Sequence, residues 1–224
     1  MHRPAAIAAS AVADSPVAEP PAPRRGRPPR APADAHARQQ LMRAGLAFLT
    51  ERGYSAVGVD EILRQAGVPK GSFYHYFNGK AAFGLALIEA YRAYFAARLD
   101  RCFDDETRDP VSRLRAFIDD AERGMARHGF RRGCLIGNLG QEMGALPEEF
   151  RAALTLALED WQARTARCLR LARDQGQIDP QHDPDALAAF FWIGWEGAVL
   201  RAKLEQRAAP LHTFAASFFR LIGH

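Results

Sequence analysis

The chain has 224 residues, of which 48% are hydrophobic and 25% are charged, so it is predicted to be a folded globular protein rather than a disordered one. Its three cysteines lack paired spacing, which argues against a disulfide framework and indicates reduced thiols in a cytoplasmic protein. No His/Cys cluster has metal-site spacing, and we expect no metal and no cofactor. The most apolar stretch, 187–200, is too short to span a membrane and contains Glu196.

The positive charge is concentrated in the N-terminal part of the chain. Residues 1–80 contain 11 Lys and Arg against 6 Asp and Glu, a net charge of +5. Residues 81–224 contain 19 against 20, a net charge of −1. Because cationic side chains neutralise phosphates, this asymmetry predicts that any contact with nucleic acid involves the N-terminal part.

The first segment, 1–34, is rich in Ala and Pro without periodicity and is predicted to be a disordered tail. Its Arg25-Gly26-Arg27-Pro28 core resembles an AT-hook, in which an extended Arg-Gly-Arg segment enters the minor groove of A·T-rich DNA. That resemblance implies DNA contacts for Arg25 and Arg27. A solubilising tail with incidental arginines explains the segment equally well.

Three helices are expected next, over about 36–52, 59–66 and 70–77. In the second, apolar residues recur at the spacing of one helix face, at Val59, Ile62, Leu63 and Ala66. Gly67 can adopt the positive φ of a sharp helix end, and Pro69 suits the entry to a new helix. The spacing therefore predicts two short helices around a tight turn.

The third helix separates an apolar side from a polar side. Phe73 and Phe77 lie four residues apart and are expected to face inward together. The residues off that stripe are polar or amphipathic: Lys70, Ser72, Tyr74, His75 and Tyr76. This pattern is typical of a recognition helix in a major groove, although an ordinary helical hairpin with a solvated face fits the spacing equally well.

The run GYSAVGVDEILRQAGVPKGSFYHYFNGKAAF closely resembles the N-terminal DNA-binding domain of TetR-family transcriptional regulators. The resemblance covers about 36–100 and implies phosphate contacts for Lys70 and Lys80, base-edge contacts for Ser72 and His75, and close backbone approach at Gly71. Tyr74 and Tyr76 are expected to contact phosphates or thymine methyl groups. Val57 and Gly58 replace hydroxyl residues that are usual in the family, so one phosphate contact is expected to be missing.

The remaining chain is expected to be helical over about 79–103, 110–128, 147–174, 184–204 and 210–222. Three glycines interrupt the apolar pattern between Gly133 and Met143. No strand pattern appears, so the predicted fold is all-α. We interpret 35–80 as a helix-turn-helix DNA-binding domain and 81–224 as an effector-binding and dimerisation domain.

The resemblance also implies a homodimer joined through the last two helices, with a palindromic DNA operator as partner. These helices contain seven large aromatic residues that would either enter such an interface or fill the core of one protomer: Phe190, Phe191, Trp192, Trp195, Phe214, Phe218 and Phe219.

Gly133-Cys134-Leu135 and Arg201-Ala202-Lys203 resemble a subgroup of these regulators that responds to electrophiles or α,β-unsaturated acids. The resemblance implies that Cys134 is a sensor thiol with Lys203 as its partner, whereas a lone buried Cys more often only packs. Five further residues are candidate contacts of a small-molecule effector: Tyr91, Asn138, Gln141, Glu142 and Trp161.

The sequence thus predicts a cytoplasmic repressor that a small molecule releases from its operator, with a nonspecific chromosome-associated protein as the alternative. No Ser/His/Asp spacing and no phosphate-binding loop in strand context is present, so we expect no enzyme.

Overall fold

The computed structural model describes residues 32–224, which form one compact unit. Residues 1–31 of the predicted tail, with Arg25 and Arg27, lie outside the described residues, so their DNA contacts stay a prediction. The predicted tail boundary at 34 is wrong, because residues 32–34 belong to the first turn of the helix that begins at Pro32. Within the described part the secondary structure is helical throughout and contains no strand, which confirms the predicted all-α fold. No helix in this part combines the length and the apolar character needed to cross a membrane.

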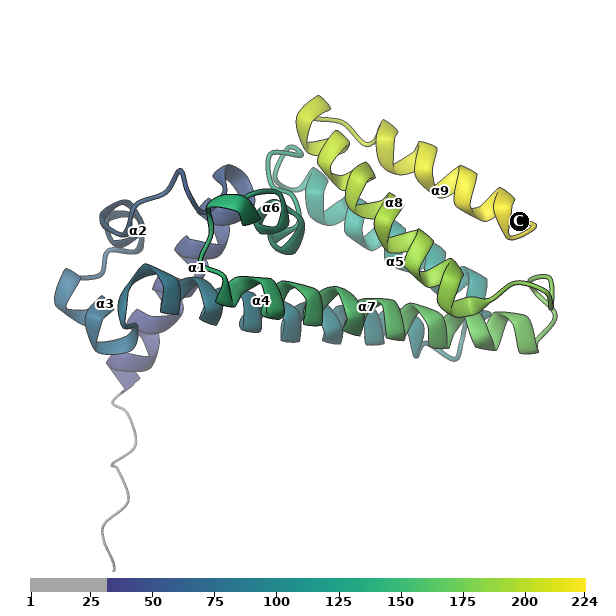
Figure 1. Cartoon of the computed structure of the whole chain (residues 1–224), viewed down its shortest axis with the longest axis horizontal. Helices are drawn as coiled ribbons and strands as arrows, with labels where there is room; N and C mark the ends of the chain where they lie inside the picture. Colours follow the sequence, from purple (N-terminus) through teal and green to yellow (C-terminus); the bar gives the residue numbers. More distant parts are fainter. Residues whose placement is uncertain (1–31) are drawn as a thin grey trace, which may run out of the picture. The chain divides into compact units, whose positions relative to one another are not determined.

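The helices follow the chain in the expected order (Figure 1). Their bounds are α1 Pro32–Arg52, α2 Val59–Ala66, α3 Lys70–Tyr76, α4 Gly79–Phe103, α5 Pro110–Ala126, α6 Leu135–Gln141, α7 Glu149–Asp174, α8 Pro184–Glu205 and α9 Ala209–Leu221. A 3₁₀ turn, η1 (Met143–Ala145), follows α6. The glycine-interrupted segment is therefore a short helix and a turn.

Helices α1 to α3 form a small bundle, and the turn between α2 and α3 has the predicted geometry. Gly67 ends α2 with φ 64°, a left-handed conformation that glycine adopts without steric cost. Gly58 caps the start of α2 without a side-chain hydrogen bond, as expected for a glycine at that position.

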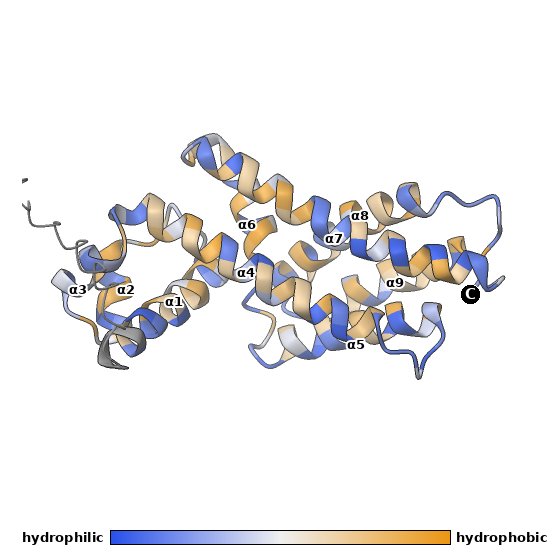
Figure 2. Ribbon diagram, turned by 90° about the horizontal axis from the view of Figure 1, so that it is seen from below, coloured by the Kyte–Doolittle hydropathy of each residue, from blue (hydrophilic) through white to orange (hydrophobic). Residues whose placement is uncertain are grey.

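Helix α4 runs from the end of the small bundle into the body of the molecule, where it lies beside α7 (Figure 1). Hydrophilic and hydrophobic segments alternate along the helices, as expected for amphipathic elements around a shared core (Figure 2). Helices α8 and α9 pack against each other beside α5 and α7.

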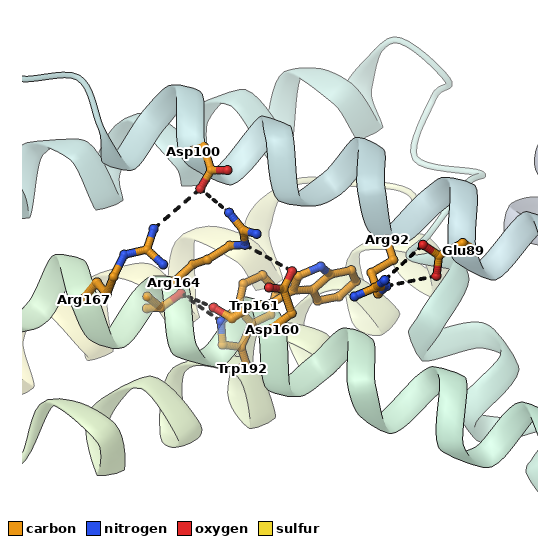
Figure 3. A network of polar contacts seen from close by, with 9 residues as sticks. Glu89, Arg92, Asp100, Asp160, Trp161, Arg164, Arg167 and Trp192 are labelled. Carbon is orange, nitrogen blue, oxygen red and sulfur yellow. Dashed lines mark hydrogen bonds and ion pairs between the residues drawn. The ribbon is translucent and has the colours of Figure 1, made fainter.

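An aromatic cluster joins α4, α7 and α8. The ring of Trp161 lies 4.3 Å from that of Phe95 and 5.0 Å from that of Trp192, measured between centroids. The Trp192 indole N–H donates to the Thr165 hydroxyl at 2.9 Å (Figure 3). Arg164 joins α7 to α4 through an ion pair with Asp100, also drawn in Figure 3. These contacts hold α4 firmly against the body.

Helix α5 begins at a strong N-terminal cap. The Asp109 carboxylate accepts hydrogen bonds from the Ser112 hydroxyl at 2.6 Å and the Ser112 N–H at 2.9 Å. Both bonds favour the ionised carboxylate and lower its pKa from 3.8 to about 2.

Replacing Asp109 with Ala is expected to lower the free energy of unfolding by about 1 kcal/mol, the usual cost of losing such a cap. Because the folded-state pKa is depressed, this contribution is present above pH 3.8 and is lost as the pH falls toward 2. Urea titrations at pH 7 and in acid would measure the difference. A loss of equal size under both conditions would contradict the role of the ionised cap.

Candidate DNA-recognition face and ligand cavity

Helix α3 is held in place by Phe73 and by Phe77, the residue that directly follows it. Phe73 is fully buried, and its ring centroid lies 5.4 Å from that of Phe83 at the start of α4. Phe77 lies 4.8 Å from the same ring. The predicted inward pair therefore docks α3 onto α4 as well as onto α1.

The opposite side of α3 faces solvent. Lys70, Gly71, Tyr74 and His75 are exposed, with 55% of the Tyr74 surface accessible, whereas Ser72 is half-buried. These side chains form one contiguous polar face on a short helix. The face has the residue types needed for contacts with phosphates and base edges.

Tyr76 differs from its neighbours on α3, because its ring is half-buried and packs against the hydrophobic core. The His75 ring lies against it, with centroids 5.1 Å apart. Tyr76 therefore supports the orientation of His75. Its own contact with DNA stays a prediction.

The two predicted phosphate-binding lysines have different surroundings. Lys70 forms an exposed ion pair with Asp60 at 3.0 Å, which costs little to exchange for a phosphate contact. Lys80 donates to the Tyr54 carbonyl oxygen at 2.7 Å, and its ammonium lies 4.1 Å from the Tyr54 ring centroid. Burial lowers the pKa of Lys80. An ammonium group has three N–H donors, so Lys80 can bind the Tyr54 carbonyl oxygen in the loop after α1 and still donate to a phosphate.

A cavity of about 200 Å³ lies in the body, lined by α1, α4, α5, α8 and the segment before α6. Two of the candidate effector contacts, Tyr91 and Cys134, line it. Trp161 does not: it is fully buried and packs behind Phe95 and Tyr91. The cavity also contains Arg98 and Glu196, which the sequence did not single out as contacts.

The Cys134 thiol is buried beside two other titratable groups. Burial, and next the nearby Glu196, raise the pKa of Cys134 well above its ordinary value. Burial also raises the pKa of the adjacent Tyr91 well above its ordinary value. Since the thiolate is the reactive form of cysteine, Cys134 is a neutral, weakly nucleophilic thiol in this environment.

Glu196 is an uncommon residue in the apolar helix α8. Burial raises the pKa of its carboxyl group to about 7, although a hydrogen bond with Cys134 opposes this shift. The sequence signal for Glu196 was its position as the one charge in the 187–200 stretch. The signal for Arg98 was its place seven residues after Tyr91, on the same face of α4.

The remaining candidate contacts lie in a separate groove of about 460 Å³ between α1, α6 and α8, lined by Asn138, Gln141, Glu142 and Lys203. Burial lowers the pKa of Lys203. No hydrogen bond or ion pair connects Lys203 to Cys134 within the described part of the chain. The structure thus divides the predicted effector residues between the cavity and this groove, and it places Trp161 in the core.

Two of the groove residues bind the end of α1 and the loop after it. The Asn138 amide donates to the carbonyl oxygens of Leu49 and Thr50, at 3.0 and 2.8 Å. The Glu142 carboxylate accepts from the backbone N–H groups of Tyr54 at 2.8 Å and Ser55 at 2.7 Å. Burial alone would raise the pKa of Glu142, but these hydrogen bonds outweigh it and lower the pKa.

The loop after α1 is shaped to receive this carboxylate. Gly53 has φ 87°, and a Cβ atom at this position would lie 2.0 Å from Glu142 Oε1. Glycine adopts this backbone conformation without strain, whereas a larger residue would be strained and would have to displace the Glu142 carboxylate. Helix α6 therefore begins at the cavity wall, next to Cys134, and ends in bonds to the small N-terminal bundle.

Comparisons with known proteins agree with this architecture. The family model described as bacterial regulatory proteins, tetR family, matches residues 41–87, and the tetracyclin repressor-like C-terminal domain matches residues 110–218. The transcriptional regulator AcuR of Cereibacter sphaeroides is 64% identical over 207 residues, which cover 92% of this chain and 94% of AcuR. The HTH-type transcriptional repressor NemR of Escherichia coli is 30% identical, over 83% of this chain and 94% of NemR. The crystal structure of a regulatory protein TetR from Rhodobacter sphaeroides superposes with a TM-score of 0.82 at 66% identity, covering 82% of this chain and 97% of that one.

Proposed function

The chain belongs to the TetR family of bacterial transcriptional regulators, which are DNA-binding proteins and not enzymes, and we propose that it is a homodimeric repressor released from a palindromic operator by a small molecule. The effector binds in the cavity beside Cys134. The protein acts in the cytoplasm, where its operator is found.

DNA binding rests on the exposed face of α3. His75 and Ser72 are proposed to contact base edges, while Lys70, Tyr74 and the backbone at Gly71 are proposed to contact phosphates; all but the half-buried Ser72 are exposed. Tyr76 and Lys80 hold neighbouring groups in position and add contacts at the edge of this face. Arg25 and Arg27 are proposed to add minor-groove contacts.

The dimer rests on an exposed apolar stripe of α8 and α9. Ile193 and Leu204 are 77% and 76% exposed, and Phe190, Leu200 and Leu221 are also exposed. A monomer would leave this patch in water, whereas a twofold interface buries it and creates the symmetry that a palindromic operator requires.

The observation that carries the regulatory part is that α6 starts at the cavity wall beside Cys134 and binds the end of α1 and the loop after it. The end of α1 also lines the cavity, at Leu46 and Thr50. A molecule that displaces the wall at Cys134 moves α6, and the bonds of Asn138 and Glu142 transmit this movement to the DNA-binding bundle. To weaken operator binding 100-fold, the effector must bind the DNA-releasing conformation more tightly than the DNA-binding one by only about 2.7 kcal/mol. The neutral thiol of Cys134 favours reversible binding of the effector over covalent reaction.

Fluorescence anisotropy with DNA from the region upstream of the protein's own gene tests this function. We expect the full chain and a variant that lacks residues 1–34 to bind the same palindrome in preference to scrambled DNA at moderate salt. Binding to both DNAs with equal affinity would instead support the nonspecific chromosome-associated protein. An effector that releases the wild type should also release Cys134→Ser, whereas loss of the response in this variant would establish a covalent sensor.

A further inference from the structure

Arg98 projects from α4 toward the cavity and uses only part of its hydrogen-bonding capacity. Its Nε atom donates to Asp120 Oδ2 at 2.5 Å. Its Nη2 atom is shielded from solvent and has no hydrogen-bond partner among the residues that the structure describes. The guanidinium lies over Gly124 of α5, where a Cβ atom would be 3.2 Å from Nη2.

A shielded donor without an acceptor is costly, particularly on a charged group. Arginine cannot remove this cost by losing a proton, because its guanidinium stays charged at all accessible pH values. Lysine or asparagine at such a position could adapt, but Arg98 requires an acceptor. A bound ligand with an oxygen at this position would supply one.

The charges around the cavity favour an anion. Arg127, His128 and Arg132 also line it, and of the described lining residues only Glu196 is acidic. Burial and the neighbouring Arg132 and Arg127 lower the pKa of His128, as expected in a positive environment. Within the described part of the chain no ion pair joins Glu196 to Arg98, whose Nε atom pairs with Asp120 and leaves Nη2 free.

We propose that the cavity binds a small organic anion, whose carboxylate accepts a hydrogen bond from Nη2 of Arg98 and whose apolar body lies against the aromatic side chains of Tyr91 and Trp195. The cavity of about 200 Å³ has room for a short organic acid. This inference rests on the proposed function only in identifying the cavity as the effector site. The sequence resemblance left two classes of effector open, acids and neutral electrophiles. Of these two, the cavity is proposed to bind the acid.

Isothermal titration calorimetry with matched pairs of probes tests the proposal. The probes are butanoate, hexanoate and benzoate, each compared with its primary amide at equal ionic strength. The amide has the same shape but no charge, so only a charged anchor distinguishes the two. We expect at least one acid to bind the wild type about 10- to 100-fold more tightly than its amide, the usual range for a hydrogen bond to a charged group.

Arg98→Gln should abolish this preference, so that acid and amide bind with equally low affinity. Asp120→Asn is the matched control, because it breaks the same ion pair but leaves the cation of Arg98 in the cavity. If Arg98 only stabilises the fold, both variants lose thermal stability and neither changes the ratio of acid to amide affinity, which overturns the proposal. Equal binding of acid and amide to the wild type, or no binding of any acid at millimolar concentration, also overturns it.

Operator release is measured separately with the same probes. If an acid binds through Arg98 but does not release DNA, the result supports the proposed anion site and contradicts the proposed regulatory function. Release by a neutral amide or aldehyde that binds Arg98→Gln as well as the wild type leaves the regulatory function intact and contradicts the anion site.

Discussion

Alanine at both Tyr74 and His75 should weaken operator binding by roughly 30- to 20,000-fold. Loss of a good base-edge contact at His75 costs about 1–3 kcal/mol, and a dimer loses it at both recognition helices, so this contact alone accounts for about 2–6 kcal/mol. Loss of the Tyr74 contact with phosphate adds a part that does not depend on the DNA sequence. Both side chains are exposed, while Phe73 and Phe77 keep α3 docked onto the bundle. Anisotropy titrations with operator and scrambled DNA at one fixed salt concentration would measure the effect.

Tyr94 offers a control of the same residue type and exposure. It lies on α4 and is 54% exposed, against 55% for Tyr74. Tyr94→Ala should leave the operator affinity of the effector-free protein unchanged. If both variants weaken binding equally, or if the double variant weakens binding to scrambled DNA as much as to operator, the exposed face of α3 does not read the sequence.

The recognition unit could be predicted because its determinants are local. The apolar spacing of α2, the positive φ of Gly67 and the inward pair Phe73 and Phe77 all lie within about 20 residues. Propensity and periodicity are strongest over such short windows. The helix bounds near Gly79, Pro110 and Pro184 followed from the same kind of signal.

The cavity could be predicted only in part, because its walls come from distant segments. Tyr91, Cys134 and Glu196 are separated by about 40 to 60 residues, and helical periodicity does not show which buried faces leave a space between them. Trp161 shows the limit: its position in an apolar stripe suited a cavity wall as well as the core, and it lies in the core.

Polar residue types near Cys134 indicated a binding role without identifying the partner. Asn138 and Glu142 were expected to meet a polar ligand, and their side chains instead bind the backbone of residues 49–55. These contacts join positions that are nearly 90 residues apart in sequence. Residue chemistry alone cannot distinguish a ligand from a distant stretch of backbone, since both present the same N–H and C=O groups.

The bonds between the α6 segment and residues 49–55 lead to the second prediction with a large expected effect. Glu142→Ala should raise the amide hydrogen-exchange rates of Tyr54 and Ser55 by about 10- to 100-fold, because each loses a hydrogen bond to a charged acceptor worth about 1.5–3 kcal/mol. The variant should still bind a small molecule that releases the wild type, with an unchanged affinity in the absence of DNA. Its ratio of operator affinities without and with that molecule should fall toward one.

Glu148→Ala is the matched control for this variant, since Glu148 is exposed and, among residues 32–224, forms an ion pair only with Arg151 one turn away. It should leave exchange at Tyr54 and the release ratio unchanged. Helix α4 provides a second connection, because it starts at Gly79 directly after the recognition helix and lines the cavity at Tyr91. If Glu142→Ala shows faster exchange but releases DNA like the wild type, Glu142 only fixes the loop after α1. The coupling then runs along α4, through the Asn138 bonds to α1, or through α1 itself, which lines the cavity at Leu46 and Thr50. If the variant still binds the molecule but no longer releases DNA, α6 is the element that couples the ligand cavity to the DNA-binding helices.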